Sequence, residues 1–149
     1  MTDINKLKQT IMNRISSEVT TVQDVADYEK TGFRGFPAVT VICSGNENDY
    51  ESTSENMRAF TFIIRVYEQL GNVPSLDAIS DNAKERAERI LGNVVSEIID
   101  TFDKFYGFGG EADYTLATPS RWGYAELPEG WCRTAEIRIE VRKSFDVST

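Results

Sequence analysis

Apolar residues recur every three or four positions in two segments of the chain, which predicts two amphipathic helices. The first helix covers about residues 4–18, and its apolar stripe consists of Ile4, Leu7, Ile11 and Ile15. The second covers about residues 76–104, with Ser75 or Ser80 as N-cap, and its stripe consists of Ile79, Ala83, Ala87, Ile90, Val94, Ile98, Phe102 and Phe105. Additional apolar residues broaden the second stripe, so we expect this long helix to pack on a sheet.

Alternating apolar and polar residues predict strands over residues 36–43, 57–67 and 132–143. A weaker pattern over 19–28 predicts a further strand, and two short strand-like pieces occur between residues 114 and 127. The 57–67 strand is the clearest, and one of its faces would consist of Phe60, Phe62, Ile64 and Val66. The last strand would bury one face, with Ala135, Ile137, Ile139 and Val141, and leave a mostly charged face in water.

The order of these elements predicts a single α+β domain over residues 1–149. Short connections between successive strands favour a mostly antiparallel sheet, and two helices with one apolar stripe each favour a common covered face. We therefore expect two layers, in which the long helix and the N-terminal helix pack on one face of the sheet.

The segment 44–56 is acidic, with no Lys or Arg. We interpret it as an exposed hairpin connection, with extended arms as one form of it. Its acidic residues either surround a solvated hairpin tip, or dock on a neighbouring subunit or line an acidic opening. The candidates for the second role are Glu47, Asp49, Glu51 and Glu55.

The charge balance excludes several classes of function. The chain has 16 Lys and Arg against 24 Asp and Glu, a net charge of −8, and it has no His. An acidic chain repels the phosphates that a nucleic-acid-binding protein must neutralise. Without His, Ser-His-Asp and Cys-His catalysis and imidazole zinc sites are excluded.

Other chemical motifs are weak, so we expect no enzyme activity, no cofactor and no metal. The glycines at 107–110 follow a helix, whereas a phosphate-binding loop precedes one, so they indicate a helix C-cap and a loop. The oxygen-rich run 46–51 lacks the central Gly and closing Glu of a calcium loop. The two cysteines, Cys43 and Cys132, are expected to be reduced, buried thiols. No apolar run approaches the 18 residues or so that would predict a membrane span.

Half of the 16 aromatic residues fall between positions 102 and 131. Large aromatic side chains in loops or edge strands are typical of interface anchors, although burial under the protein's own loop is the alternative. Trp122 and Tyr124 would point the same way on a strand. The candidate interface residues are Tyr106, Phe108, Trp122, Tyr124 and Trp131.

The layout of the whole chain resembles the tail terminator, or tail completion, proteins of long-tailed bacteriophages. The resemblance rests on the order and pattern of the elements, with no diagnostic motif. The segments that carry it are the N-terminal helix 4–15, the Pro-containing strand 36–41, the long strand 58–67, the long helix 83–102 and the closing strand 133–142.

The resemblance implies a structural protein of the virion, present at the head-proximal end of the tail. Six copies would form a ring that caps the tail tube, stops its polymerisation and provides a docking face for the head connector. The partners would be further copies of the chain, the tube protein and the connector, with no membrane, while DNA passes through without specific binding. The alternatives are a neck or head–tail connector subunit, which shares much of this layout, and a small-molecule-binding or enzymatic α+β domain.

Overall fold

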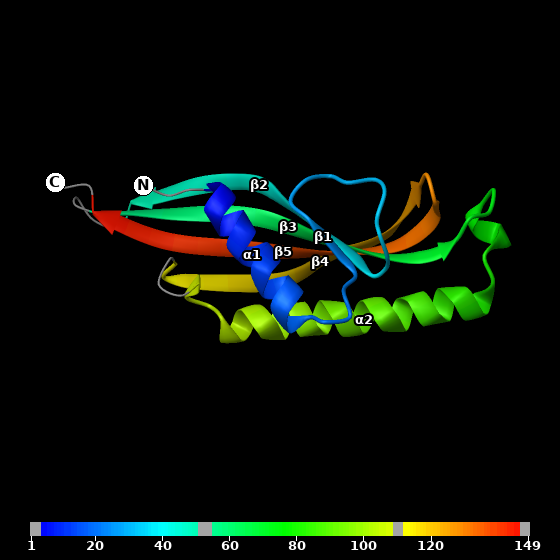
Figure 1. The fold of residues 1–149 in the computed structure, drawn as a ribbon. Coiled ribbons are helices and arrows are strands. Elements are labelled where there is room, and N and C mark those ends of the chain that lie inside the picture. Colours follow the sequence, from blue (N-terminus) through cyan, green and yellow to red (C-terminus); the bar gives the residue numbers. More distant parts are fainter. Residues whose placement is uncertain (1–3, 51–54, 109–111, 147–149) are drawn as a thin grey trace.

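The computed structural model of the chain describes residues 4–50, 55–108 and 112–146. Figure 1 shows a long, twisted sheet with the α-helices against it. The elements are α1 (Ile4–Glu18), β1 (Asp24–Ala26), β2 (Ala38–Tyr50), β3 (Glu55–Gly71), the 3-10 helix η1 (Leu76–Ala78), α2 (Asp81–Lys104), β4 (Tyr114–Leu127) and β5 (Gly130–Asp146).

The sheet has five strands in the order β1-β2-β3-β5-β4. The short β1 runs parallel to β2, and all other neighbours are antiparallel. The central pair is also the longest, because β3 and β5 stay paired from Glu55 opposite Asp146 to Gly71 opposite Trp131. The expected mostly antiparallel α+β architecture is confirmed.

Both helices cover the same face of the sheet. The inward residues of β2, β3 and β5 form one apolar cluster with α1 and α2, and the cluster includes the four residues expected on one face of β3. In Figure 1, α2 lies along the sheet while α1 crosses it nearer the β2 margin. The side chains that are fully buried here include Ile11, Ile15, Phe62, Ile98 and Ile137.

The long helix begins later than its apolar spacing predicts. Residues 76–78 form a 3-10 turn, and α2 starts after Ser80, whose hydroxyl accepts a hydrogen bond from the Ala83 backbone N–H at 3.2 Å. Ser80 is therefore the N-cap, and Ser75 makes no side-chain cap of the 3-10 turn. Ile79 fits the helical spacing although it precedes α2. It is apolar because it packs with Leu70 and Ala87 in a separate apolar cluster.

Two expected connections are strand instead. Most of the segment 44–56 belongs to β2 and β3, which pair as far as Tyr50 opposite Asn56, so the extended-arm form is the correct one. The two pieces expected between 114 and 127 are a single strand, β4, with a register shift between Pro119 and Arg121. The hairpin tip, residues 51–54, lies outside the described residues.

The opposite face of the sheet is covered in part by the segment between β1 and β2. Phe33 and Phe36 from this segment pack with Ala38, Tyr67 and Cys132. Asp24 holds the segment in place, because its carboxylate accepts hydrogen bonds from the Lys30 ammonium (2.8 Å), the Arg34 backbone N–H (3.0 Å) and the Arg34 guanidinium (3.2 Å).

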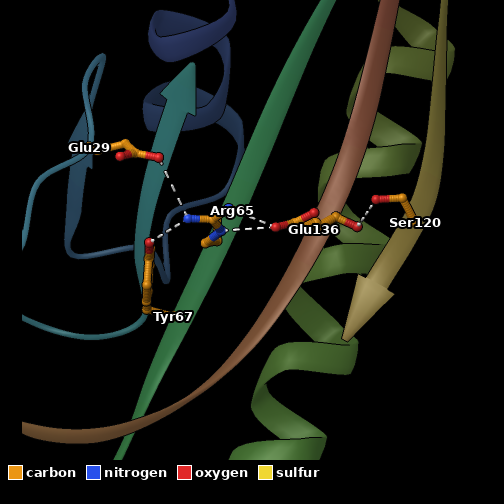
Figure 2. A network of polar contacts seen from close by, with 5 residues as sticks. All are labelled: Glu29, Arg65, Tyr67, Ser120 and Glu136. Carbon is orange, nitrogen blue, oxygen red and sulfur yellow. Dashed lines mark hydrogen bonds and ion pairs between the residues drawn. The ribbon is translucent and has the colours of Figure 1, made fainter. Parts of the chain in front are cut away.

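A second polar network joins this segment to the sheet (Figure 2). Arg65 on β3 donates twice to the Glu136 carboxylate on β5, at 2.8 and 3.0 Å, and also contacts the Tyr67 hydroxyl at 3.5 Å. Glu29 approaches the Arg65 guanidinium at 4.0 Å. The Ser120 hydroxyl donates to the Glu136 backbone carbonyl at 3.5 Å, which connects β4 to β5 where the register shifts.

Replacing Gly130 by Ala should destabilise the fold. Gly130 has a φ of +129°, and a Cβ at this position would lie 2.6 Å from the Gly71 carbonyl oxygen. We expect the free energy of unfolding to fall by about 1–3 kcal/mol. Gly92→Ala is the matched control, because nothing lies within 4 Å of its added Cβ in α2 and it should raise stability by up to about 1 kcal/mol. Equal effects of both changes in urea unfolding would contradict this assignment.

Replacing Asp24 by Asn should destabilise the fold in a pH-dependent way. Burial alone would raise the pKa of Asp24, but hydrogen bonds from Lys30 and Arg34 outweigh it and lower the pKa below its ordinary value. The carboxylate therefore stabilises the fold above its unfolded-state pKa, and this contribution is lost as the pH falls through the lower folded-state pKa. Urea unfolding should show a difference of about 1–3 kcal/mol between the two proteins at pH 7 that shrinks below pH 4. A difference that stays constant would contradict the mechanism.

Candidate interaction surface

The strand β4 forms one margin of the sheet, and its outer backbone groups have no strand partner. Among the strands that the structure describes, β5 is the only neighbour of β4. An edge strand presents a row of backbone N–H and C=O groups that can pair with another chain. With 14 residues, β4 is a long edge of this kind.

Exposed apolar side chains concentrate on this same strand. Four of the seven large apolar residues that are most exposed in the described part of the chain lie on β4, namely Tyr114, Leu116, Trp122 and Tyr124; the other three are Ile4, Tyr28 and Tyr106. Such a concentration on one unpaired edge is typical of an interaction surface rather than of scattered surface residues.

Trp122 and Tyr124 lie on the helix-bearing face, where Trp122 is opposite the buried Ala135. The Arg133 guanidinium on β5 lies 4.5 Å from the ring centroid of Tyr124 and 5.5 Å from that of Trp122. Tyr124 is 46% exposed and Trp122 is 38% exposed. We call Trp122, Tyr124 and Arg133 the aromatic shelf.

The helix α2 and the backbone of β4 fix the position of Arg133. Its guanidinium pairs with the Glu88 carboxylate at 2.8 and 3.3 Å, and it donates to the Gly123 carbonyl at 3.0 Å. The hydrogen bond with Glu88 is the main cause that raises the pKa of Arg133. Because the cation is held from two sides, the rings beside it lose less side-chain entropy when a partner docks.

Tyr114 and Leu116 lie on the opposite face of β4. Their neighbour Thr115 points to the helix-bearing side with Val141, so the alternation along the strand turns Tyr114 and Leu116 to the other side. The register shift at Pro119 then brings Trp122 onto the helix-bearing face. Along this unpaired edge, exposed apolar side chains therefore lie on both faces of the sheet.

The other candidate aromatic residues do not belong to the aromatic shelf. Phe108 was expected at an interface, but it is only 2% exposed and stacks on Phe105 beside Phe102, so it is part of the chain's own core. Trp131 is partly buried and packs against the cluster of Leu70 and Ile79. Tyr106 is exposed, but it follows the end of α2 and lies outside β4.

The candidate acidic residues lie along the hairpin arms. Glu47 and Asp49 belong to β2 and pair with Ala59 and Met57, while Glu55 begins β3 opposite Asp146. Glu51 lies outside the described residues. The role of these residues at a lumen or a docking surface stays a prediction.

A second unpaired edge lies on the other side of the sheet, and the sequence patterns did not indicate it. The strand β2 has 13 residues, but β1 pairs only with Ala38, Val39 and Thr40. Among the described strands, none pairs with the outer side of the remaining ten residues, 41–50. No local pattern could have indicated this edge, because it follows from the order of the strands in the sheet.

The structure also has a hollow between α1 and α2. Its volume is about 350 Å³, and it is lined by Arg14, Glu18, Glu97, Asp100, Thr101, Lys104 and Phe105. The Arg14 guanidinium lies 3.5 Å from the Phe105 ring centroid and covers it. Glu68, whose pKa is raised by burial, lies on β3 and does not line this hollow. The three acidic residues that do line the hollow, Glu18, Glu97 and Asp100, are exposed.

Three further observations bear on function. Within residues 4–50, 55–108 and 112–146, no group of three or more Cys, Asp and Glu residues is placed to hold a metal ion. No helix in this part of the chain is long and apolar enough to cross a membrane. Comparison with protein-family models and with curated protein sequences finds no match to this chain.

The two cysteines differ in environment. Cys43 was expected to be buried, but it is exposed on β2, beyond the three residues that pair with β1. Cys132 is buried as expected, and burial together with the charges of Glu129 and Glu68 raises its pKa to about 12.

In unassembled protein, a maleimide reagent should therefore modify one thiol per native chain. Cys43 is accessible, whereas the Cys132 thiol is both buried and protonated at neutral pH. Mass spectrometry of the intact protein should show one added group under native conditions and two in denaturant. In Cys43→Ser, native labelling should disappear, and rapid native labelling of Cys132 would contradict the described packing.

Proposed function

We propose that this chain is a structural assembly protein of a long-tailed phage, which forms a ring that caps the tail tube. The ring stops polymerisation of the tube and offers a docking face to the head connector. The proposal combines the resemblance in element order with the surface of the domain. Its activity is the presentation of shape and charge to other proteins.

The observation that carries the proposal is the unpaired, apolar edge of β4. Four large apolar residues are exposed along a strand whose outer backbone has no partner among the described strands. In a protein that acted alone, such an edge would favour aggregation. A role in assembly accounts for it, because a neighbouring subunit would cover both the backbone and the apolar side chains.

The net charge of −8 is compatible with a ring around DNA. DNA must slide through the bore without adhering, and negative potential on the wall repels its phosphates. The acidic arms of the hairpin, with Glu47, Asp49 and Glu55, are the candidates for this wall. The same charge disfavours a protein that reads or compacts DNA.

Replacing Trp122 by Ala should weaken assembly much more than it weakens the fold. Trp122 is 38% exposed on the aromatic shelf, so its loss removes contact area from a partner and little from the core. We expect a tenfold or greater fall in the assembled fraction, measured by native mass spectrometry, with a shift of the melting temperature of about 5 °C or less.

Trp131→Ala is the matched control, because the same change at this partly buried residue should lower stability by roughly 2–4 kcal/mol.

Imaging of purified tail tubes with added protein tests the function itself, and capped tubes of fixed length would support it. Binding to filled heads in place of tubes would indicate a neck or connector subunit. A protein that is monomeric and leaves tubes unchanged would contradict the proposal.

A further inference from the structure

The sheet has two unpaired edges, on opposite sides and of similar length. One is β4, with 14 residues, and the other is the stretch of β2 from residue 41 to residue 50. We infer that β4 of one copy pairs with this stretch of β2 in the next copy, so that the sheet continues from subunit to subunit. This inference rests on the proposed ring and names its interface.

Strand direction favours this pairing. Because β2, β3, β5 and β4 are antiparallel in turn, β4 runs opposite to β2 within one copy. A rotation about an axis roughly along the strands carries β2 of the next copy to the outer side of β4 without reversing it. The new pair is then antiparallel, and the alternation is unbroken across the interface. A contact between two different patches of this kind closes into a ring when the rotation closes.

Charge argues against pairing β2 with itself. The stretch 41–50 carries Glu47 and Asp49 and no basic residue, so two copies would bring four carboxylates into one short ladder. Like charges across a strand pair are destabilising. The strand β4 carries Arg121 and only one acidic residue, Glu126, so it is the better partner for the acidic edge.

Irregularities on both edges favour one register. The pairing of β2 shifts between Cys43 and Gly45, and that of β4 shifts between Pro119 and Arg121. When Cys43 is placed opposite Trp122, the two shifts fall side by side, because residues 44–45 of β2 then lie opposite residues 120–121 of β4. Both residues belong to the helix-bearing face, because Cys43 is the partner of Phe62 and Trp122 that of Ala135. Shifting the pairing by one residue would put these two side chains on opposite faces of the sheet. The register with Cys43 opposite Trp122 is therefore the one compatible with the side-chain alternation.

The exposed side chains fit this contact. The aromatic shelf would cover the exposed Cys43 from the next copy, while Tyr114 and Leu116 would lie on the other face of the junction. Pro119 has no N–H to donate, so together with the register shift it divides the edge and discourages unspecific pairing. The competing arrangement is a two-fold pairing of β4 with β4, which would leave the edge of β2 unused.

Mixing two variants tests the inference. Trp122→Lys should block the edge of β4, and Cys43→Lys should block that of β2, since each places a charge in the contact at an exposed position. Ser16→Lys on the exposed side of α1 is the control for added charge. Each blocked variant alone should be monomeric, with an assembled fraction lowered about tenfold or more relative to wild type. An equimolar mixture should form a heterodimer that does not grow, because only one complementary pair of edges remains.

The readouts are native mass spectrometry for assembly and circular dichroism for folding, with Tyr124→Lys as a second β4 variant if Trp122→Lys fails to fold. A heterodimer in the mixture supports the inference, and it does so even if wild-type protein fails to cap tail tubes, which would count against the proposed function alone. Homodimers of Cys43→Lys would indicate the two-fold pairing of β4 and overturn the inference. Rings formed by both blocked variants would also overturn it while leaving the proposed ring intact, whereas a monomeric wild type would contradict both.

Discussion

The constraint on which this structure depends is that a sheet has two faces and two edges, and two α-helices in the described chain cover only one face. Burial of that face provides the core, because the inward residues of β2, β3 and β5 meet α1 and α2 in one apolar cluster. The other face is protected in part by the segment that Asp24 holds. The two edges of the sheet remain uncovered. The outer backbone N–H and C=O groups there can form hydrogen bonds only with water or with another chain.

This division accounts for the distribution of polar and apolar side chains. On the partly open face, the Arg65 guanidinium is satisfied within the chain by Glu136 and Tyr67. At the β4 margin the arrangement differs, since Arg133 and Glu88 hold two aromatic rings at the surface. Rigid, half-exposed rings beside unpaired backbone are suited to recognition by a folded partner of fixed shape.

Residue patterns predicted the elements whose periodicity is set by burial. The stripe of α1, the alternation of β3 and the helical layer on one face are all confirmed, because each depends on which side chains leave water. Features that depend on distant packing were not predictable. Alternation assigns Cys43 to the buried face, but it does not show that Cys43 lies at a margin of the sheet, beyond the pairing with β1. Phe108 lies in loop-like sequence, and only the fold brings it onto Phe102 and Phe105. The unpaired edges follow from strand order, which no local pattern encodes.

Hydrogen–deuterium exchange of the backbone, with and without assembly, tests the central claim most directly. In unassembled protein, amides on the outer sides of β4 and of β2 over residues 41–50 should exchange rapidly, whereas those of β3 and β5 should be protected. On assembly, these two edges should gain protection together, while the solvent-facing side of α2 remains unchanged. Assembly that protects α2 and leaves both edges in rapid exchange would contradict the account.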